Sequence, residues 1–339
     1  MPPRSKSQFL WTVAAFGLAA LLLYLVLRGV SWSEVASILS RARIPPLAAA
    51  FGLGSLAYAL RALRWKIVLT AAANLEFSAV FWASSAGYLG NSFLPARAGE
   101  VIRSAMVSAR SDLSKTYVLT TALAERAVDL AVLLALSSAV VLISGKAPAA
   151  LLPAGAVMLG LALTVVVVLF LVPRTERFWR MLVQQLWLPE RWRAWLLRML
   201  EQVVLGMLAF HHWSRLARFV ALTVCVWCAD AYGATLVARS LGMHLPLEAA
   251  FVLLAGLALG STVPSTPGYV GVFQFVTVTV LYAYGIGHSA GLTYSLVLQA
   301  ASYAVITFWG VIGICKFRSL QQVHAENPLV PVDAHRHAP

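Results

Sequence analysis

Ionisable residues inside a long apolar segment are the first candidates for chemistry in this chain. Glu125, Arg126 and Asp129 lie within the segment 116–143. Glu125 and Asp129 are four residues apart and share one face of a helix, whereas Arg126 projects about 100° away. Such groups are costly in a membrane unless they are paired or hydrated. They could line a polar cavity that binds a charged headgroup or carries protons, or they could form an internal salt bridge that locks helix packing.

A second candidate site follows an interruption rich in Gly, Asn and Pro. Arg97, Glu100 and Arg103 are spaced by three, so they lie on one side of a new helix. The two arginines could present guanidinium groups to a phosphate while Glu100 holds one of them, and the helix N-terminus favours an anion. Tyr88 and Asn91 could add polar contacts. The alternative is a set of cytoplasmic charges with an internal ion pair.

Asp230 is a further ionisable residue in an apolar segment, 217–240. It could contribute to the same polar cavity. It could instead be satisfied inside the helix bundle by the hydroxyl groups of a nearby tyrosine and threonine.

Composition places these residues in a membrane protein. Of 339 residues, 60% are hydrophobic and 12% are charged, with a mean hydropathy of +0.80. A soluble protein has about 45–50% apolar and about 25% charged residues, so soluble, disordered and fibrous classes are excluded. The net charge of +13 fits cytoplasmic basic loops and anionic lipid headgroups better than nucleic acid.

Apolar segments of about 20 residues can cross a bilayer as helices. Six segments meet this length, at about 9–27, 45–63, 116–143, 151–172, 217–240 and 289–315. Two more are broken into halves too short to cross, which predicts re-entrant helical hairpins over 77–110 and 249–285. The breaks contain Pro95 and Gly99 in the first segment and Pro264, Pro267, Gly268 and Gly271 in the second.

The distribution of basic residues sets the predicted orientation. With both termini in the cytoplasm, 20 of the 26 Lys and Arg residues fall in cytoplasmic segments. The hairpins then enter from opposite sides, and paired broken helices indicate a binding site near the membrane midplane. We therefore predict an all-α polytopic membrane protein with about six full spans and two oppositely oriented hairpins.

The predicted transmembrane domain is 8–318, between a cytoplasmic N-terminus at 1–7 and a mobile cytoplasmic tail at 319–339. Within it, 174–216 is a basic and aromatic cytoplasmic segment. Tryptophan and leucine residues recur at helical spacing there, which is typical of a helix lying at the membrane interface.

Motifs for the common enzyme chemistries are missing. The sequence has no P-loop, no G-x-S-x-G and no H-E-x-x-H motif, and its three cysteines form neither a disulfide framework nor a zinc site. We therefore expect no cofactor, no metal site and no enzymatic activity.

Three stretches, 94–103, 125–129 and 264–274, resemble signatures of the flippase-like membrane family that includes the transmembrane region of lysylphosphatidylglycerol synthases. The resemblance covers about 8–318. It implies a bacterial-type inner-membrane protein with two re-entrant segments that moves lipids between leaflets. The residues that match the family pattern are Pro95, Arg97, Gly99, Glu100, Arg103, Glu125, Arg126, Asp129, Pro267, Gly268 and Gly271.

The sequence departs from the family in two respects. Gln274 stands where the family usually has Glu, so the resemblance carries no proton-linked or cation-binding role to that position. No stretch resembles the soluble aminoacyltransferase domain of the synthases, so we do not expect aminoacyl-lipid synthesis.

The combined hypothesis is a flippase or transporter that moves a phospholipid or another polar-headgroup lipid through a cavity between the hairpins. Its partners would be membrane lipids with anionic or zwitterionic headgroups, with no nucleic acid; the oligomeric state stays open. The alternatives are a lipid-modifying transferase using Glu100, an accessory subunit of an envelope-lipid pathway, and a secondary transporter of a soluble anion. The candidate substrate-binding residues are Arg97, Glu100, Arg103, Glu125, Arg126, Asp129, Tyr88, Asn91, Asp230 and Gln274.

Overall fold

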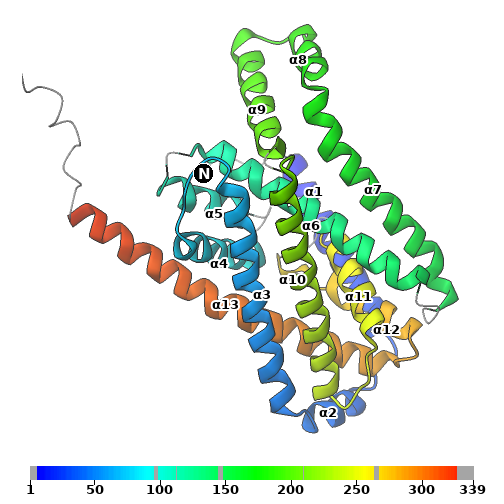
Figure 1. The fold of residues 1–339 in the computed structure, drawn as a ribbon. Coiled ribbons are helices and arrows are strands. Elements are labelled where there is room, and N and C mark those ends of the chain that lie inside the picture. Colours follow the sequence, from blue (N-terminus) through cyan, green and yellow to red (C-terminus); the bar gives the residue numbers. More distant parts are fainter. Residues whose placement is uncertain are drawn as a thin grey trace, which may run out of the picture.

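Helices make up the regular structure of the part of the chain that the computed structural model describes, residues 6–94, 98–111, 113–143, 148–208, 210–262 and 267–326 (Figure 1). The α-helices are α1 (Lys6–Leu27), α2 (Trp32–Ser40), α3 (Ile44–Leu69), α4 (Phe77–Phe93), α5 (Ala98–Ser108), α6 (Lys115–Ile143), α7 (Leu152–Arg174), α8 (Glu176–Gln185), α9 (Glu190–Leu208), α10 (Trp213–Ser240), α11 (Leu247–Gly260), α12 (Val272–Ala283) and α13 (His288–Glu326).

Within those residues, five helices are long and apolar enough to cross a membrane: α3, α6, α7, α10 and α13. A sixth crossing results if the end of α1 from Gly17 and α2 form one span, which is bent by 82°. The five long helices lie in segments that hydropathy predicts, and the all-α polytopic fold is confirmed. The bent pair differs from the single span predicted at 9–27, because it includes α2. Some boundaries differ: α3 continues past its predicted end at 63 to Leu69, α10 begins at Trp213 rather than at 217, and α13 continues past 315 to Glu326.

Each broken segment forms two helices that pack against each other. We call α4 with α5 hairpin 1, and α11 with α12 hairpin 2. In hairpin 1 the helices approach so closely that a Cβ atom on Gly99 would overlap the carbonyl oxygen of Gly87. Glycine at 99 is therefore required for this packing, since an added methyl group has no room. Pro95 lies outside the described residues.

Hairpin 2 turns through backbone conformations that favour glycine. Gly268 has φ of +78° and Gly271 has φ of +90°, and both lie in the interruption between α11 and α12. Residues with side chains rarely adopt these angles, so the two glycines allow the chain to reverse. Pro267 begins a short 3-10 turn in the same interruption, η3 (Pro267–Tyr269), and Pro264 lies outside the described residues.

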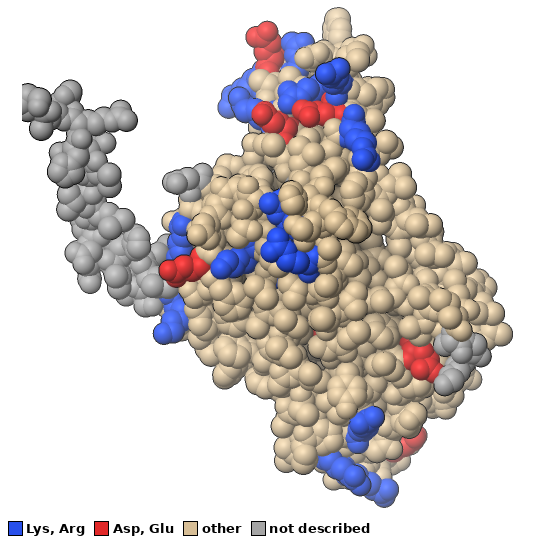
Figure 2. All heavy atoms as spheres, viewed as in Figure 1, with Lys and Arg blue, Asp and Glu red and all other residues tan. Residues whose placement is uncertain are grey.

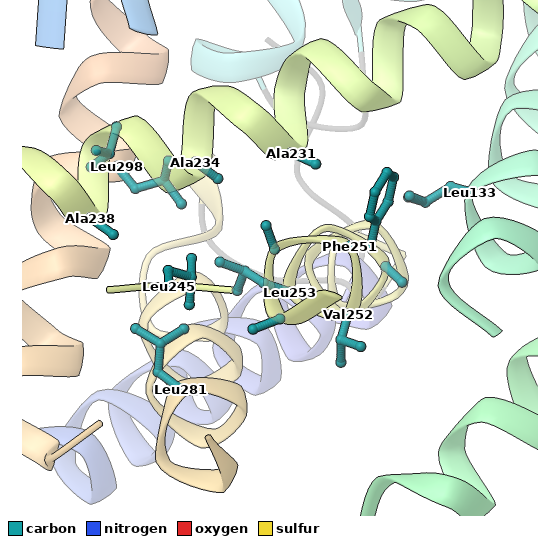
Figure 3. Close-up of a cluster of buried hydrophobic side chains, with 14 of the residues drawn as sticks. Leu133, Ala231, Ala234, Ala238, Leu245, Phe251, Val252, Leu253, Leu281 and Leu298 are labelled. Carbon is teal, nitrogen blue, oxygen red and sulfur yellow. The ribbon is translucent and has the colours of Figure 1, made fainter. Parts of the chain in front are cut away.

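Hairpin 2 sits at the centre of the largest apolar core. Phe251 and Leu253 of α11 are buried together with Leu133 of α6 and Leu281 of α12 (Figure 3). The buried residues of α11 lie within 249–255, so this part of the 14-residue helix is held by packing in the core.

On the face shown in Figure 2, charged side chains gather at the top of the molecule, in a group about halfway down, and toward the lower end, with uncharged surface between these groups. The predicted segment 174–216 forms α8, α9 and the first turn of α10. In Figure 1, α8 and α9 rise beyond the end of α10 as an antiparallel pair. The end of α9 is anchored on α6, where Gly206 packs against Thr120.

Candidate functional site

Arg64 of α3 occupies the centre of a buried ion-pair network. Its guanidinium donates to Glu125 at 2.8 Å and to Asp129 at 2.5 Å, both on α6. The two carboxylates do share one helix face, because a single guanidinium reaches both. Arg64 also donates to the hydroxyl of Thr223 at 3.0 Å and lies 4.9 Å from the Phe219 ring centroid. The side chain has no exposed surface, and these contacts replace the hydration of its two terminal nitrogens, whereas Nε has no hydrogen-bond partner among the described residues.

Hairpin 1 extends this network. Arg103 of α5 donates to Glu100 at 2.5 Å and to Glu125 at 3.0 Å. Glu100 also accepts hydrogen bonds from Asn91 at 3.1 Å and from Arg126 at 3.2 Å. Arg103 is 1% exposed, so its guanidinium is committed to two carboxylates rather than presented to a phosphate. Its role in the structure is to join α5 to α6.

A further pair joins α3 to α10. Arg61 contacts Asp230, and their side chains are 14% and 18% exposed. Among the described residues the clustered groups therefore balance as four arginines and four carboxylates: Arg61, Arg64, Arg103, Arg126, Glu100, Glu125, Asp129 and Asp230. Equal numbers of opposite charges avoid an unpaired charge in a low-dielectric environment.

A cavity of about 340 Å³ lies beside this network. Its walls come from α3, α6, α10 and α13 and from both hairpins. One end is polar, with Tyr58, Arg61, Tyr88, Arg126 and Asp230. The remaining walls are mainly apolar and include Leu254, Leu257, Phe273, Leu298, Val305 and Ile306.

The polar end contains groups with unused bonding capacity. Arg126 is 30% exposed, in contrast to the buried Arg64 and Arg103, and lies 5.2 Å from the ring centroid of Tyr88. The Tyr88 hydroxyl is buried and has no hydrogen-bond partner among the described residues. Buried hydroxyl groups normally have a partner, so a ligand in the cavity would satisfy this one.

A second, apolar cavity of about 250 Å³ adjoins the first. Four residues, Trp227, Leu254, Leu257 and Phe273, belong to the walls of both. The second cavity continues along hairpin 2, past Ala258, Ser261, Tyr269 and Val272. Polar and apolar spaces are therefore adjacent.

The sequence model of one protein family, described as the lysylphosphatidylglycerol synthase TM region, matches residues 12–310, most of the chain. The chain belongs to this family. No curated protein matches the chain. Membership in the lysylphosphatidylglycerol synthase TM region family, together with the apolar helices, identifies a multi-pass membrane protein of a lipid-related family.

In this family member the predicted site residues divide into two groups. Tyr88, Arg126 and Asp230 line the cavity. The other described candidates around the network are set behind its wall: Asn91, Glu100, Arg103, Glu125 and Asp129. Arg97, for which we predicted a phosphate contact, lies outside the described residues.

Gln274 has a different position from the one we expected, because it does not line the cavity. It is 2% exposed and accepts a hydrogen bond from the Gly271 backbone at 2.7 Å. Its amide donates to Gln299 of α13 at 2.7 Å, and Gln299 donates in turn to the carbonyl of Gly268 at 2.9 Å. Gln274 therefore ties the turn of hairpin 2 to α13.

Asp230 also differs from one expectation. The hydroxyl of Thr235 donates to the carbonyl of Tyr232 at 2.7 Å rather than to Asp230. The partner is Arg61, which lies at the end of the predicted span 45–63 and, like Arg64, was not among the predicted site residues. The sequence does indicate that both arginines lie within a helix, because they are three residues apart and apolar residues follow them from Ile67. This spacing places them on one face of that helix.

Proposed function

We propose that this protein moves a polar-headgroup lipid between the leaflets of a bacterial-type inner membrane. The headgroup would cross through the 340 Å³ cavity, and hairpins 1 and 2 would be re-entrant segments from opposite sides. The observation that carries the proposal is a cavity walled by both hairpins, polar at one end and adjoining a second, apolar cavity. This volume falls within the range of about 300–1,000 Å³ for small-molecule sites.

The adjoining apolar cavity favours a lipid over a soluble anion. A soluble anion would leave that cavity unfilled, whereas an amphiphile would place its headgroup near Arg126 and its first methylene groups against Leu254 and Leu257. Burial of apolar surface contributes about 25 cal/mol per Å². Only the headgroup then needs polar contacts, because the acyl chains can remain in the bilayer.

The chain order supports the opposite entry of the hairpins. Hairpin 1 connects the end of α3 to the start of α6, and hairpin 2 connects the end of α10 to the start of α13. Three candidate spans, α6, α7 and α10, lie between those two positions, and an odd number of crossings would put the two connections on opposite sides. Broken helices that meet from two sides near the midplane are a recurrent design for transport sites. The basic α8–α9 region indicates that hairpin 1 enters from the cytoplasm.

The proposal involves no covalent step. A transferase would need an available carboxylate, and Glu100, the candidate for that role, accepts hydrogen bonds from Asn91, Arg103 and Arg126. These contacts give Glu100 a role in joining elements. We therefore propose that membrane lipids are transported without being chemically changed.

Blocking the cavity tests the proposal directly. Gly233 lines the cavity, and a Cβ atom there meets nothing within 4 Å, so Gly233→Leu should fill space without a backbone clash. Gly160 of α7 is equally unobstructed but lies outside the cavity, so Gly160→Leu is the matched control. In proteoliposomes with leaflet-specific lipid detection, Gly233→Leu should slow lipid movement while the control matches the parent protein. Equal rates for all three proteins would contradict the proposal.

A further inference from the structure

The Arg61–Asp230 pair differs from the rest of the network in its accessibility and in its number of partners. Both side chains line the cavity, and within the described residues each has the other as its one partner of opposite charge within 4 Å. Arg64, Arg103 and Arg126 instead contact two carboxylates each. The Arg61–Asp230 pair is therefore the one that a ligand can open without dismantling the buried network.

Arg61 would stay in place when the pair opens. Its guanidinium carbon lies 6.0 Å from the ring centroid of Tyr58 and 5.8 Å from that of Trp227. Aromatic faces at this range attract a cation, so they position Arg61 independently of Asp230. Together with the exposed part of Arg126 and the unpartnered hydroxyl of Tyr88, Arg61 forms a cluster of donors at one end of the cavity.

These donors can bind a phosphodiester, but charge balance also requires the ligand to carry a positive charge. A phosphate on Arg61 would leave Asp230 without a cation, and an uncompensated buried carboxylate is strongly unfavourable. The eight charged groups of the cluster already sum to zero. A ligand that is itself net neutral preserves this balance, provided that it brings a cation to Asp230.

We propose, building on the proposed transport function, that the cavity takes a zwitterionic headgroup with a phosphate and a primary amine. The phosphate binds Arg61, Arg126 and the Tyr88 hydroxyl, and the ammonium group binds Asp230. In the absence of the headgroup, Arg61 and Asp230 satisfy each other. The site thereby selects against a purely anionic headgroup, which would leave Asp230 unpaired.

Two lipids that differ in this respect provide the test. The full-length protein is reconstituted in vesicles of phosphatidylethanolamine and phosphatidylglycerol in equal parts. Outer-leaflet amine is measured with membrane-impermeant trinitrobenzenesulfonate, and outer-leaflet glycerol with periodate. The parent protein should move phosphatidylethanolamine about tenfold faster or more, which corresponds to about 1.4 kcal/mol. Asp230→Asn should abolish this preference, whereas Glu34→Gln, an exposed carboxylate change on α2, should leave it unchanged.

Binding is measured separately in detergent, so that failure of transport and failure of the site assignment are distinguishable. Dihexanoyl phosphatidylethanolamine should raise the Tm of the parent protein more than dihexanoyl phosphatidylglycerol does. Free phosphoethanolamine should raise it less than the lipid, because the apolar cavity stays empty. The double variant Arg61→Gln/Asp230→Asn carries no lone charge and should lose the lipid preference while remaining folded.

Each outcome decides one of the two proposals. Equal movement of both lipids by the parent protein would overturn the zwitterion assignment and leave transport intact. Preferential binding of the phosphatidylethanolamine form without any lipid movement would support the assignment and contradict transport. Equal binding of the two short-chain lipids, or a preference retained in the double variant, would overturn the assignment. Equal stabilisation by free phosphoethanolamine would overturn the choice of a lipid.

Discussion

Gly99 of α5 packs directly on Gly87 of α4, and this contact sets the distance between the two helices of hairpin 1. A Cβ atom on Gly99 would overlap the carbonyl oxygen of Gly87 and lie 2.5 Å from the backbone nitrogen of Asn91. The obstructing atoms belong to the backbone, so no side-chain rotation can relieve the clash. The position of Glu100 and Arg103 beside α6 therefore depends on a residue without a side chain.

Replacing Gly99 with alanine should destabilise the protein by forcing α4 and α5 apart. Overpacking typically costs about 1–3 kcal/mol, and a backbone clash lies at the upper end. Thermal unfolding in detergent should show a lower Tm for Gly99→Ala. Gly52→Ala is the matched control, because a Cβ atom at Gly52 meets nothing within 4 Å. An unchanged Tm for Gly99→Ala would show that hairpin 1 tolerates a wider separation.

Replacing Arg64 with methionine should also destabilise the protein. Glu125 and Asp129 would lose their shared partner, and breaking a buried pair costs about 3–5 kcal/mol. Arg64→Met/Asp129→Asn should recover part of the loss, because one of the two carboxylates is then neutral. The Tm of thermal unfolding measures both effects, and Arg198→Met, at an exposed position on α9, is the control. Additive effects of the two substitutions would argue against direct coupling.

Exchanging Gln274 for glutamate should weaken the connection between hairpin 2 and α13. A carboxylate cannot donate to the Gln299 oxygen, so two acceptors would face each other at the place of the present 2.7 Å hydrogen bond. Leaving a buried acceptor unsatisfied costs about 1–3 kcal/mol. The expected decrease in Tm is compared with Gln185→Glu, an exposed position on α8. If both variants unfold at the parent temperature, the amide donor is dispensable.

Neutralising Arg126 should affect transport more than stability. The side chain is partly exposed in the cavity, and Glu100 and Asp129 keep Arg103 and Arg64 as partners after its removal. Arg126→Gln should slow lipid movement about tenfold or more. Leaflet-specific detection in proteoliposomes checks the rate, and Tm checks the fold. Transport at the parent rate would exclude Arg126 from the headgroup site.

Hydropathy was sufficient to locate the long helices α3, α6, α7, α10 and α13, because each crossing needs its own length of apolar chain, but it did not predict α2. The Gly and Pro residues within two apolar segments also located both interruptions, since these residues weaken a helix in its interior. The pairing of Arg61 with Asp230 could not be predicted, because it depends on how α3 and α10 align along their lengths. Sequence spacing placed Glu100 and Arg103 on one helix face, but only the packing of α5 on α6 determines that this face is buried.

Arg61 and Arg64 lie on successive turns of α3, one facing the cavity and the other locked between Glu125 and Asp129. A displacement of α3 along its axis would separate Arg64 from both carboxylates, at a cost comparable to much of a typical protein's stability. In the proposed function α3 would contact the headgroup, and its ion pairs fix it to α6 and α10. Arg103 ties α5 of hairpin 1 to Glu125 of α6 in the same way, so in the proposed transport cycle hairpin 1 would stay with these helices and the binding groups would stay at one depth.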